Sequence, residues 1–246
     1  MRTERIGDAT LYLGDCRDVL PGLSGVDAVV TDPPYGIGFD YLSYADTQEN
    51  LAALVASIIR PAIQAFDRVI VTPGQTQLWL YPPADWVASV CWDTTATFGH
   101  CGYSQWMPVL VYGADVPGFG RVASGRLKSD VIRFSGGAGV GFQRNAVEKA
   151  HTCPKPENVM HALVARFSDE NETILDPFMG SGTTGVACAR LGRSFIGIEI
   201  EPRYFDIACR RIEQAQRQRD LFVHAPVPEP PEDARIRDLF APLAAD

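Results

Sequence analysis

The stretch Leu175–Gly185, with the sequence LDPFMGSGTTG, contains the residues that decide the fold. Residues 173–175 are typical of a buried strand, and residues 183–191 are typical of a helix. Small residues between them let a ligand approach bare backbone, and the free amides at a helix N-terminus attract anions. Gly180–Gly185 also satisfies the pattern G-x-G-x-x-G, with Glu199 ending the next expected strand. The stretch predicts a nucleotide-like cofactor, although a tight strand-to-helix connection can use glycine for steric reasons alone.

Expected strands and helices alternate along most of the chain. We expect strands at 9–13, 26–31, 68–72, 87–94, 107–112, 173–175 and 195–200, and helices at 49–66, 156–167, 183–191 and 202–217. We expect the first two strands to be neighbours. The alternation predicts an α/β fold in one domain. Residues 113–150 show no sustained period, and the Pro-rich, acidic tail from His224 is typical of an extended linker.

The composition is that of an ordinary globular chain of 246 residues, with 46% hydrophobic and 21% charged residues. No apolar run reaches the roughly 20 residues that span a bilayer, and no apolar signal region follows the N-terminus. We therefore expect a cytoplasmic protein. The six cysteines form no C-x-x-C pair, which favours reduced thiols and predicts no metal site.

The net charge of −8 argues against a nucleic-acid partner, but the charge is unevenly distributed. Residues 118–155 contain seven Lys and Arg residues against two acidic ones. A basic face on an acidic body suits a protein that touches DNA with one surface, and an ordinary solvated loop is the alternative. The residues that we expect to contact DNA are Arg121, Arg126, Lys128, Arg133, Arg144 and Lys149.

A second motif, Asp32-Pro33-Pro34-Tyr35, follows the expected strand 26–31. Two consecutive prolines fix the backbone and remove two N–H donors, which leaves carbonyl acceptors close to the Asp32 carboxylate. Tyr35 adds an aromatic ring. An extruded nucleobase with an amino group needs such acceptors and a ring face for stacking. The motif predicts a catalytic loop, with a rigid Pro-Pro turn as the alternative.

Together the two motifs resemble the catalytic loop and the cofactor loop of DNA methyltransferases that act on amino groups, the N6-adenine and N4-cytosine family. Their order, with D-P-P-Y before D-P-F-x-G-S-G, is similar to that of the circularly permuted β class. Further matches lie at Gly14–Cys16, His151–Glu157, Arg193–Glu199 and Tyr204–Ile212. One departure is Thr152, which stands where family members usually have proline.

The resemblance implies a Rossmann-like, circularly permuted S-adenosylmethionine-dependent methyltransferase fold, with a mixed, mostly parallel seven-stranded sheet and helices on both faces. It divides the chain into a catalytic part (1–112), a small target-recognition insertion (113–150), a cofactor-binding part of the same domain (151–217) and a tail (218–246). It implies a site-specific enzyme that flips a base out of double-stranded DNA and methylates N6 of adenine, because the motif begins with aspartate. It also allows a homodimer and a cognate restriction endonuclease as partners.

The resemblance also assigns roles to residues. Asp32 and the Pro33 carbonyl would accept the two amino hydrogens, and Tyr35 would stack on the base. For S-adenosylmethionine, Asp15 and Cys16 would contact the adenine, Glu199 the ribose, and Lys155 would close the methionine pocket. The residues expected in the cofactor loop are Asp176, Pro177, Phe178, Gly180, Ser181, Gly182 and Thr183.

Several alternatives remain open. N4 of cytosine is a second acceptor, and a non-catalytic DNA-binding relative would keep the same fold. An NAD-dependent oxidoreductase would share the glycine turn without explaining D-P-P-Y. Methylation of RNA or of a protein glutamine uses a related N-P-P-Y loop. Methylation at carbon 5 of cytosine is excluded, because its cysteine nucleophile lies in a Pro-Cys dipeptide and the chain has none.

Overall fold

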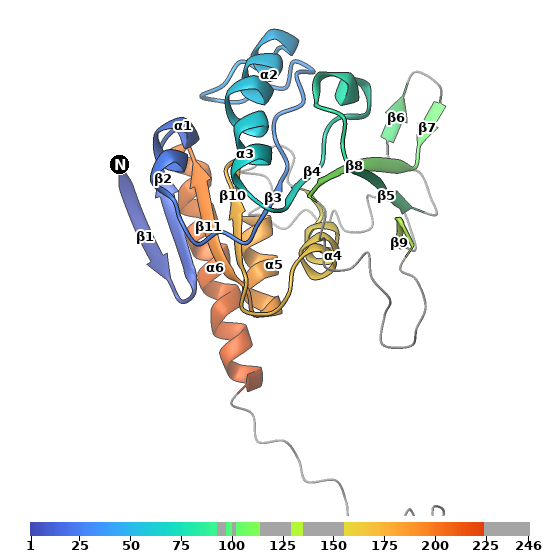
Figure 1. Cartoon of the computed structure of the whole chain (residues 1–246). Helices are drawn as coiled ribbons and strands as arrows, with labels where there is room; N and C mark the ends of the chain where they lie inside the picture. Colours follow the sequence, from blue (N-terminus) through green and yellow to red (C-terminus); the bar gives the residue numbers. More distant parts are fainter. Residues whose placement is uncertain (93–96, 100–101, 114–128, 135–154, 224–246) are drawn as a thin grey trace, which may run out of the picture.

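The structure of the chain is a computed structural model that describes residues 1–92, 97–99, 102–113, 129–134 and 155–223. Within these ranges the strands are β1 (Arg2–Ile6), β2 (Ala9–Leu13), β3 (Ala28–Thr31), β4 (Val69–Val71), β5 (Trp86–Trp92), β6 (Thr97–Gly99), β7 (Gly102–Ser104), β8 (Trp106–Tyr112), β9 (Val131–Phe134), β10 (Thr173–Asp176) and β11 (Ser194–Glu199). Nine of these described strands form one sheet in the order β1-β2-β11-β10-β3-β4-β8-β5-β9 (Figure 1). β6 and β7 form a separate pair.

The central strands of the sheet run parallel. β2, β11, β10, β3 and β4 pair in parallel, and β8 joins β4 antiparallel. The predicted mixed, mostly parallel sheet is confirmed. The sheet has nine strands within the described ranges instead of the predicted seven, because β1 and β9 extend it at its two edges (Figure 1). Both are short strands without a continuous buried apolar run, which is why the sequence does not mark them.

The prediction that β2 and β3 are neighbours is wrong. β11 pairs with β2, and β10 pairs with both β11 and β3, so two strands from the C-terminal part lie between them. Consequently the strand before D-P-P-Y lies directly beside the strand that ends in the D-P-F motif. Thr31 and Asp176, which are 145 residues apart in the chain, are hydrogen-bonded across this pairing.

Helices cover both faces of the sheet, as predicted. They are α1 (Cys16–Val19), α2 (Gln48–Leu54), a π-helical stretch (Val55–Ile59), α3 (Arg60–Ala65), α4 (Glu157–Phe167), α5 (Thr183–Leu191) and α6 (Pro202–Val223), with 3₁₀ segments at Leu20–Gly22 and Gln75–Leu80. α4, α5 and α6 pack against one face, and α1 with the helical segment 48–65 packs against the other. In β3, Ala28 and Val30 are buried under the first layer and Val29 under the second. Strands covered on both faces are therefore apolar at consecutive positions.

Most predicted elements match the observed ones within a few residues; two predicted helices differ, and one strand is observed where none is predicted. The predicted helix 49–66 contains the π-helical stretch Val55–Ile59. α6 continues to Val223, because no proline interrupts the chain before Pro226. β9 lies inside the segment 113–150, where no regular structure is predicted, and pairs in parallel with β5. Most of that segment and the tail from 224 lie outside the described residues. Among the described helices, none is long and apolar enough to cross a membrane.

The parallel strands end at one edge of the sheet, and this edge positions the site. Asp176 and Glu199 end β10 and β11, while Asp32 and Thr72 directly follow β3 and β4. Asp15 follows β2 by two residues. In doubly wound α/β sheets, ligands bind outside the carboxyl ends of the strands. The fold therefore gathers these side chains where a ligand is expected.

Candidate functional site

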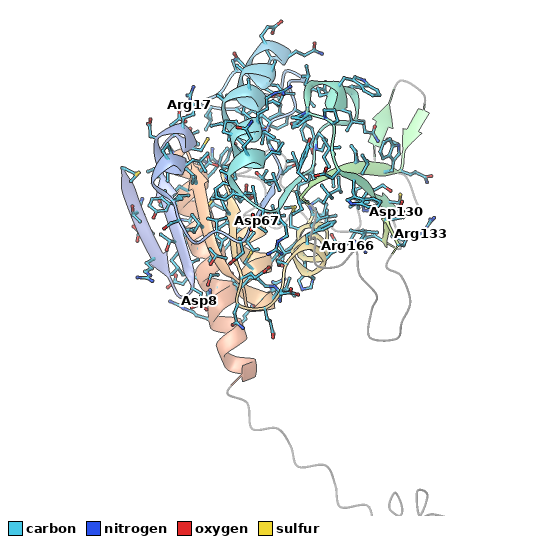
Figure 2. The ribbon with its side chains drawn as sticks, in the orientation of Figure 1. Asp8, Arg17, Asp67, Asp130, Arg133 and Arg166 are labelled. Atoms are coloured by element: carbon cyan, nitrogen blue, oxygen red, sulfur yellow. The ribbon has the colours of Figure 1, made fainter. Side chains whose placement is uncertain are left out.

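A cavity of about 490 Å³ opens at this carboxyl edge. Small-molecule sites have volumes of about 300–1,000 Å³. The cavity joins residues of both predicted motifs, since its lining includes Asp15, Cys16, Asp32, Pro34, Lys155, Asp176, Pro177, Phe178, Gly180, Ser181, Thr183 and Glu199. Arg17 on α1 also lines the cavity. Figure 2 shows Arg17 at the opposite end of the sheet from Asp8, the residue that directly precedes β2.

Asp176 is almost completely buried at the end of β10, with 2% of its surface exposed. Its Oδ1 accepts hydrogen bonds from the Thr31 hydroxyl (2.7 Å) and the Phe178 amide (3.1 Å). Its Oδ2 accepts a hydrogen bond from the Thr184 hydroxyl (2.6 Å). Burial raises the pKa of Asp176 to about 6, although these hydrogen bonds act in the opposite direction. Asp176 thus ties together β3, the glycine turn and α5.

Glu199 has a similar environment at the end of β11, with 9% of its surface exposed. Its Oε2 accepts a hydrogen bond from the Gly180 amide (2.9 Å), and its Oε1 accepts one from the Glu201 amide (2.8 Å). Burial raises the pKa of Glu199 to about 7, against the effect of these two bonds. The carboxylate therefore fixes the glycine turn, and its contact with a ribose stays a prediction.

The glycines after Gly180 are explained by packing. Gly182 has a φ of 82°, and a Cβ there would lie 2.9 Å from the Ala208 Cβ on α6. A Cβ on Gly185 would lie 2.5 Å from the Ile212 Cδ1, also on α6. Close packing against α6 therefore explains why these two positions of the G-x-G-x-x-G pattern are glycine.

Arg211, which lies in the matched stretch Tyr204–Ile212 but receives no role from the resemblance, holds the turn from the α6 side. Its Nη1 donates to the Ser181 carbonyl (2.8 Å) and to the Ser181 hydroxyl (2.9 Å). Ser181 lines the cavity. Arg211 thus supports the cavity wall from behind, through a contact between residues far apart in the chain.

Asp15 and Cys16 lie at the start of α1. Asp15 caps the helix, because its Oδ1 accepts a hydrogen bond from the Arg17 amide (2.9 Å). The Arg17 guanidinium also donates to this carboxylate, which lowers the pKa of Asp15. Burial raises the pKa of the Cys16 thiol to about 12, so the thiol stays protonated and forms a neutral part of the cavity wall.

The D-P-P-Y loop brings together donors from three parts of the chain. Asp32 Oδ1 accepts hydrogen bonds from the Tyr35 hydroxyl (2.8 Å) and the Thr72 hydroxyl (2.6 Å). The Lys155 Nζ lies 3.3 Å from the same oxygen and 4.5 Å from the centre of the Tyr35 ring. Lys155 also donates to the Tyr35 hydroxyl. The structure thus places Lys155 beside the D-P-P-Y loop, in the wall of the cavity that the glycine turn also lines.

The segment 36–47 after Tyr35 forms another wall of the cavity, which no sequence motif predicts. The buried Asp46 holds it, because its Oδ1 accepts from the Gly36 amide (2.6 Å) and its Oδ2 from the amides of Ile37 (3.1 Å) and Phe39 (3.0 Å). Residues 41–45 line the cavity. No sequence motif marks Asp46, since its partners are backbone amides that every residue type except proline provides.

Among the predicted DNA-binding residues, Arg133 lies in the described part of the chain. It is exposed on β9, at the edge of the sheet (Figure 2). The other predicted DNA-binding residues lie outside the described residues, namely Arg121, Arg126, Lys128, Arg144 and Lys149. In the described ranges, no three His, Cys, Asp or Glu side chains are grouped so that they could hold a metal ion.

Sequence comparisons find relatives that cover parts of the chain. Residues 92–210 match the N6_N4_Mtase family, described as "DNA methylase". The type II methyltransferase M.HinfI of Haemophilus influenzae is 43% identical over 67 residues, which make up 27% of this chain and 19% of that protein. M2.DpnII of Streptococcus pneumoniae, also a type II methyltransferase, is 49% identical over 63 residues, or 26% of this chain and 24% of that protein. The matches thus span a quarter or less of the length of these relatives.

Solved structures share the fold over most of the chain. The M1.HpyAVI–SAM complex has a TM-score of 0.61 at 21% identity and covers 83% of this chain and 98% of its own. The PvuII DNA methyltransferase, described as cytosine-N4-specific, has a TM-score of 0.61 at 14% identity, with coverages of 90% and 94%. The predicted methyltransferase fold class is confirmed. Residues 92–210 thus match the N6/N4 DNA methylase family model, short stretches match type II methyltransferases, and the chain shares the fold of the solved DNA methyltransferases.

Proposed function

We propose that this chain transfers the methyl group of S-adenosylmethionine to an exocyclic amino group in double-stranded DNA, with N6 of adenine as the acceptor. One observation carries the proposal: Asp32 and the turn at 176–183 line the same cavity from directly adjacent strands, β3 and β10. Methyl transfer requires donor and acceptor to be held side by side and in line. A cavity shared by a cofactor turn and an acceptor loop suits that requirement.

The described residues fit S-adenosylmethionine, which supplies a methyl group already activated on a positively charged sulfur. Asp176 and Glu199 are buried carboxylates in the cavity wall, with pKa values raised by burial. A cationic ligand nearby would favour their ionised forms. Glu199 would contact the ribose, Asp15 and Cys16 the adenine, and the turn at 176–183 the methionine end.

The D-P-P-Y loop would bind the acceptor base. Asp32 would accept one hydrogen of the target amino group and the Pro33 carbonyl the other, which draws the nitrogen lone pair out of conjugation with the ring. Pro34 lacks an N–H and so adds no donor that would compete for these acceptors. The Tyr35 ring would stack on the flipped base and offset part of its unstacking cost of a few kcal/mol.

We favour adenine over cytosine because the motif begins with Asp32, where the family tendency is aspartate for adenine and serine for cytosine. N4 of cytosine is the alternative acceptor. Both bases present a planar amino group with two hydrogens, so the same loop chemistry would serve either one. Analysis of the methylated nucleoside distinguishes the two.

The basic segment supplies the proposed contact with DNA. Residues 121–149 contain six Lys and Arg residues that would neutralise backbone phosphates. We further propose a site-specific role in a restriction-modification system, because the relatives named above are type II methyltransferases. A homodimer and a cognate restriction endonuclease are the partners proposed with that role.

Label transfer from tritiated S-adenosylmethionine to unmethylated genomic DNA tests the activity. We expect the parent to transfer label and Asp32→Ala to transfer none while it binds S-adenosylmethionine as tightly as the parent. Asp67→Ala is the matched control, because Asp67 is exposed and precedes β4 at the other end of the strand (Figure 2). An Asp32→Ala protein as active as the parent, or an inert parent, would refute the proposal. Thermal stabilisation by NAD in place of S-adenosylmethionine would favour the oxidoreductase alternative.

A further inference from the structure

The two carboxylate oxygens of Asp32 have different surroundings. Oδ1 accepts hydrogen bonds from the hydroxyls of Tyr35 and Thr72, and the Lys155 Nζ lies 3.3 Å away. Oδ2 accepts no hydrogen bond from the residues that the structure describes. The side chain lines the cavity and is 26% exposed. One oxygen is thus held by the protein, and the other can receive a donor from a ligand.

Backbone pairing between β3 and β4 brings Thr72 to Asp32. Thr31 lies opposite Val71 in the parallel register, and the Thr72 amide donates to the Thr31 carbonyl (3.1 Å). The next residue on each strand is therefore held at a fixed position. Thr72 is 1% exposed, so water has little access to its hydroxyl. The O···O distance of 2.6 Å to Asp32 is typical of a hydroxyl that donates to an ionised carboxylate.

We propose that Thr72 is a positioning residue for the catalytic carboxylate: its buried hydroxyl anchors Oδ1, so that Oδ2 accepts the hydrogen bond from the target amino group. This inference rests on the function proposed above. The prolines fix the backbone of the loop, but the terminal torsion of an aspartate side chain has a broad, roughly two-fold preference. An anchor on one oxygen removes that freedom before the base arrives.

Tyr35 and Lys155 are less suited to this anchoring role. The Tyr35 ring is the surface on which the base would stack, so its position depends on the bound state. Lys155 reaches Asp32 through a long, flexible side chain that is 19% exposed. Thr72, by contrast, has one side-chain torsion to its hydroxyl and is attached directly to a sheet strand.

Two substitutions separate the hydroxyl from the shape of Thr72. Thr72→Val keeps the branched shape and removes the donor, and Thr72→Ser keeps the donor. Single-turnover label transfer at saturating DNA should slow about 10- to 100-fold in Thr72→Val, which corresponds to one lost hydrogen bond to a charged group. Thr72→Ser should stay within about threefold of the parent. Both should bind S-adenosylmethionine with unchanged affinity. Thr10→Val on β2 is the matched control and should match the parent.

The outcomes distinguish this inference from the proposed function. If the parent transfers label and Thr72→Val is equally fast, the positioning role is wrong and the methyltransferase function stands. Equal losses in the Ser and Val variants would assign the effect to packing and also overturn the role. If Thr72→Val does not fold, Thr72→Cys replaces it: the weak S–H donor should make it slower than Thr72→Ser, and equal rates refute the role. A parent without activity overturns both proposals.

Discussion

Replacing Asp176 by asparagine should make the free energy of unfolding less dependent on pH. Burial raises the pKa of Asp176 from its ordinary value of 3.8 to about 6. Such a difference corresponds to about 3 kcal/mol, which the folded state loses when the carboxyl ionises. Because the folded-state pKa is the higher one, this stabilisation is complete below about pH 4 and is lost as the pH rises through about 6.

Asparagine suits the site because its neighbours include two hydroxyls, which can donate or accept. Its Oδ1 can keep the hydrogen bonds from the Thr31 hydroxyl and the Phe178 amide. Its Nδ2 can donate to the Thr184 hydroxyl oxygen, which reverses the direction of the present bond. We therefore expect a folded variant that lacks only the ionisable group.

Urea unfolding of parent and variant without cofactor, at several pH values, measures the effect. The difference between the two proteins cancels the groups that titrate independently of Asp176 and retains its charge coupling to the buried Glu199, whose pKa the Asp176 carboxylate raises. The free energy of unfolding of the variant minus that of the parent should rise by about 2 kcal/mol between about pH 4.5 and about pH 7.5. A difference that does not change with pH, or that shifts in favour of the parent, would refute the conclusion that burial disfavours ionised Asp176.

Two further predictions concern the glycine turn. Gly182→Ala should lower the free energy of unfolding by about 2–3 kcal/mol, because an alanine there combines a strained left-handed backbone with a close Cβ contact to Ala208. Gly22→Ala is the control: a Cβ at Gly22 meets nothing within 4 Å, so the free energy of unfolding should change by less than about 1 kcal/mol. Equal stabilities in denaturant titrations would contradict this account. Arg211→Ala should weaken S-adenosylmethionine binding about three- to tenfold, because Ser181 loses two hydrogen bonds; calorimetry measures the affinity. Arg210→Ala, on the exposed side of α6, is the control and should bind as tightly as the parent. An unchanged affinity in Arg211→Ala would show that the turn holds its shape without this brace.

The fold class could be predicted from the sequence because its signals are local. The apolar run, the glycines and the helix around residues 173–191 are contiguous, and the structure has a strand, a turn and a helix there. The strand order could not be predicted in the same way. β2 and β3 are both apolar and close in the chain, but β10 and β11 from the C-terminal part pair between them. Such long-range pairing leaves no mark in a local pattern.

The residues of the candidate site also differ in whether a local sequence pattern marks them. Asp32 and Asp176 could be found because each lies in a motif of contiguous residues with restricted backbone chemistry. The roles of Thr72 and Arg211 could not, since each acts through a contact with a distant segment, although Arg211 lies in the matched stretch Tyr204–Ile212. Asp46 could not either, because its partners are backbone amides that no motif marks. A threonine after a strand or an arginine in a helix is common in any sequence, and its role depends on the partner that the fold places beside it.

The direct pairing of β3 with β10 leaves little freedom between the two motifs. Backbone hydrogen bonds, together with the bond between Thr31 and Asp176, set the separation of the D-P-P-Y loop from the turn at 176–183. No hinge or domain interface lies between these two strands. In the proposed reaction, mutations in loops would therefore change which DNA sequence is bound and leave the distance that the methyl group travels unaltered, so that target choice and chemistry would evolve as separable traits.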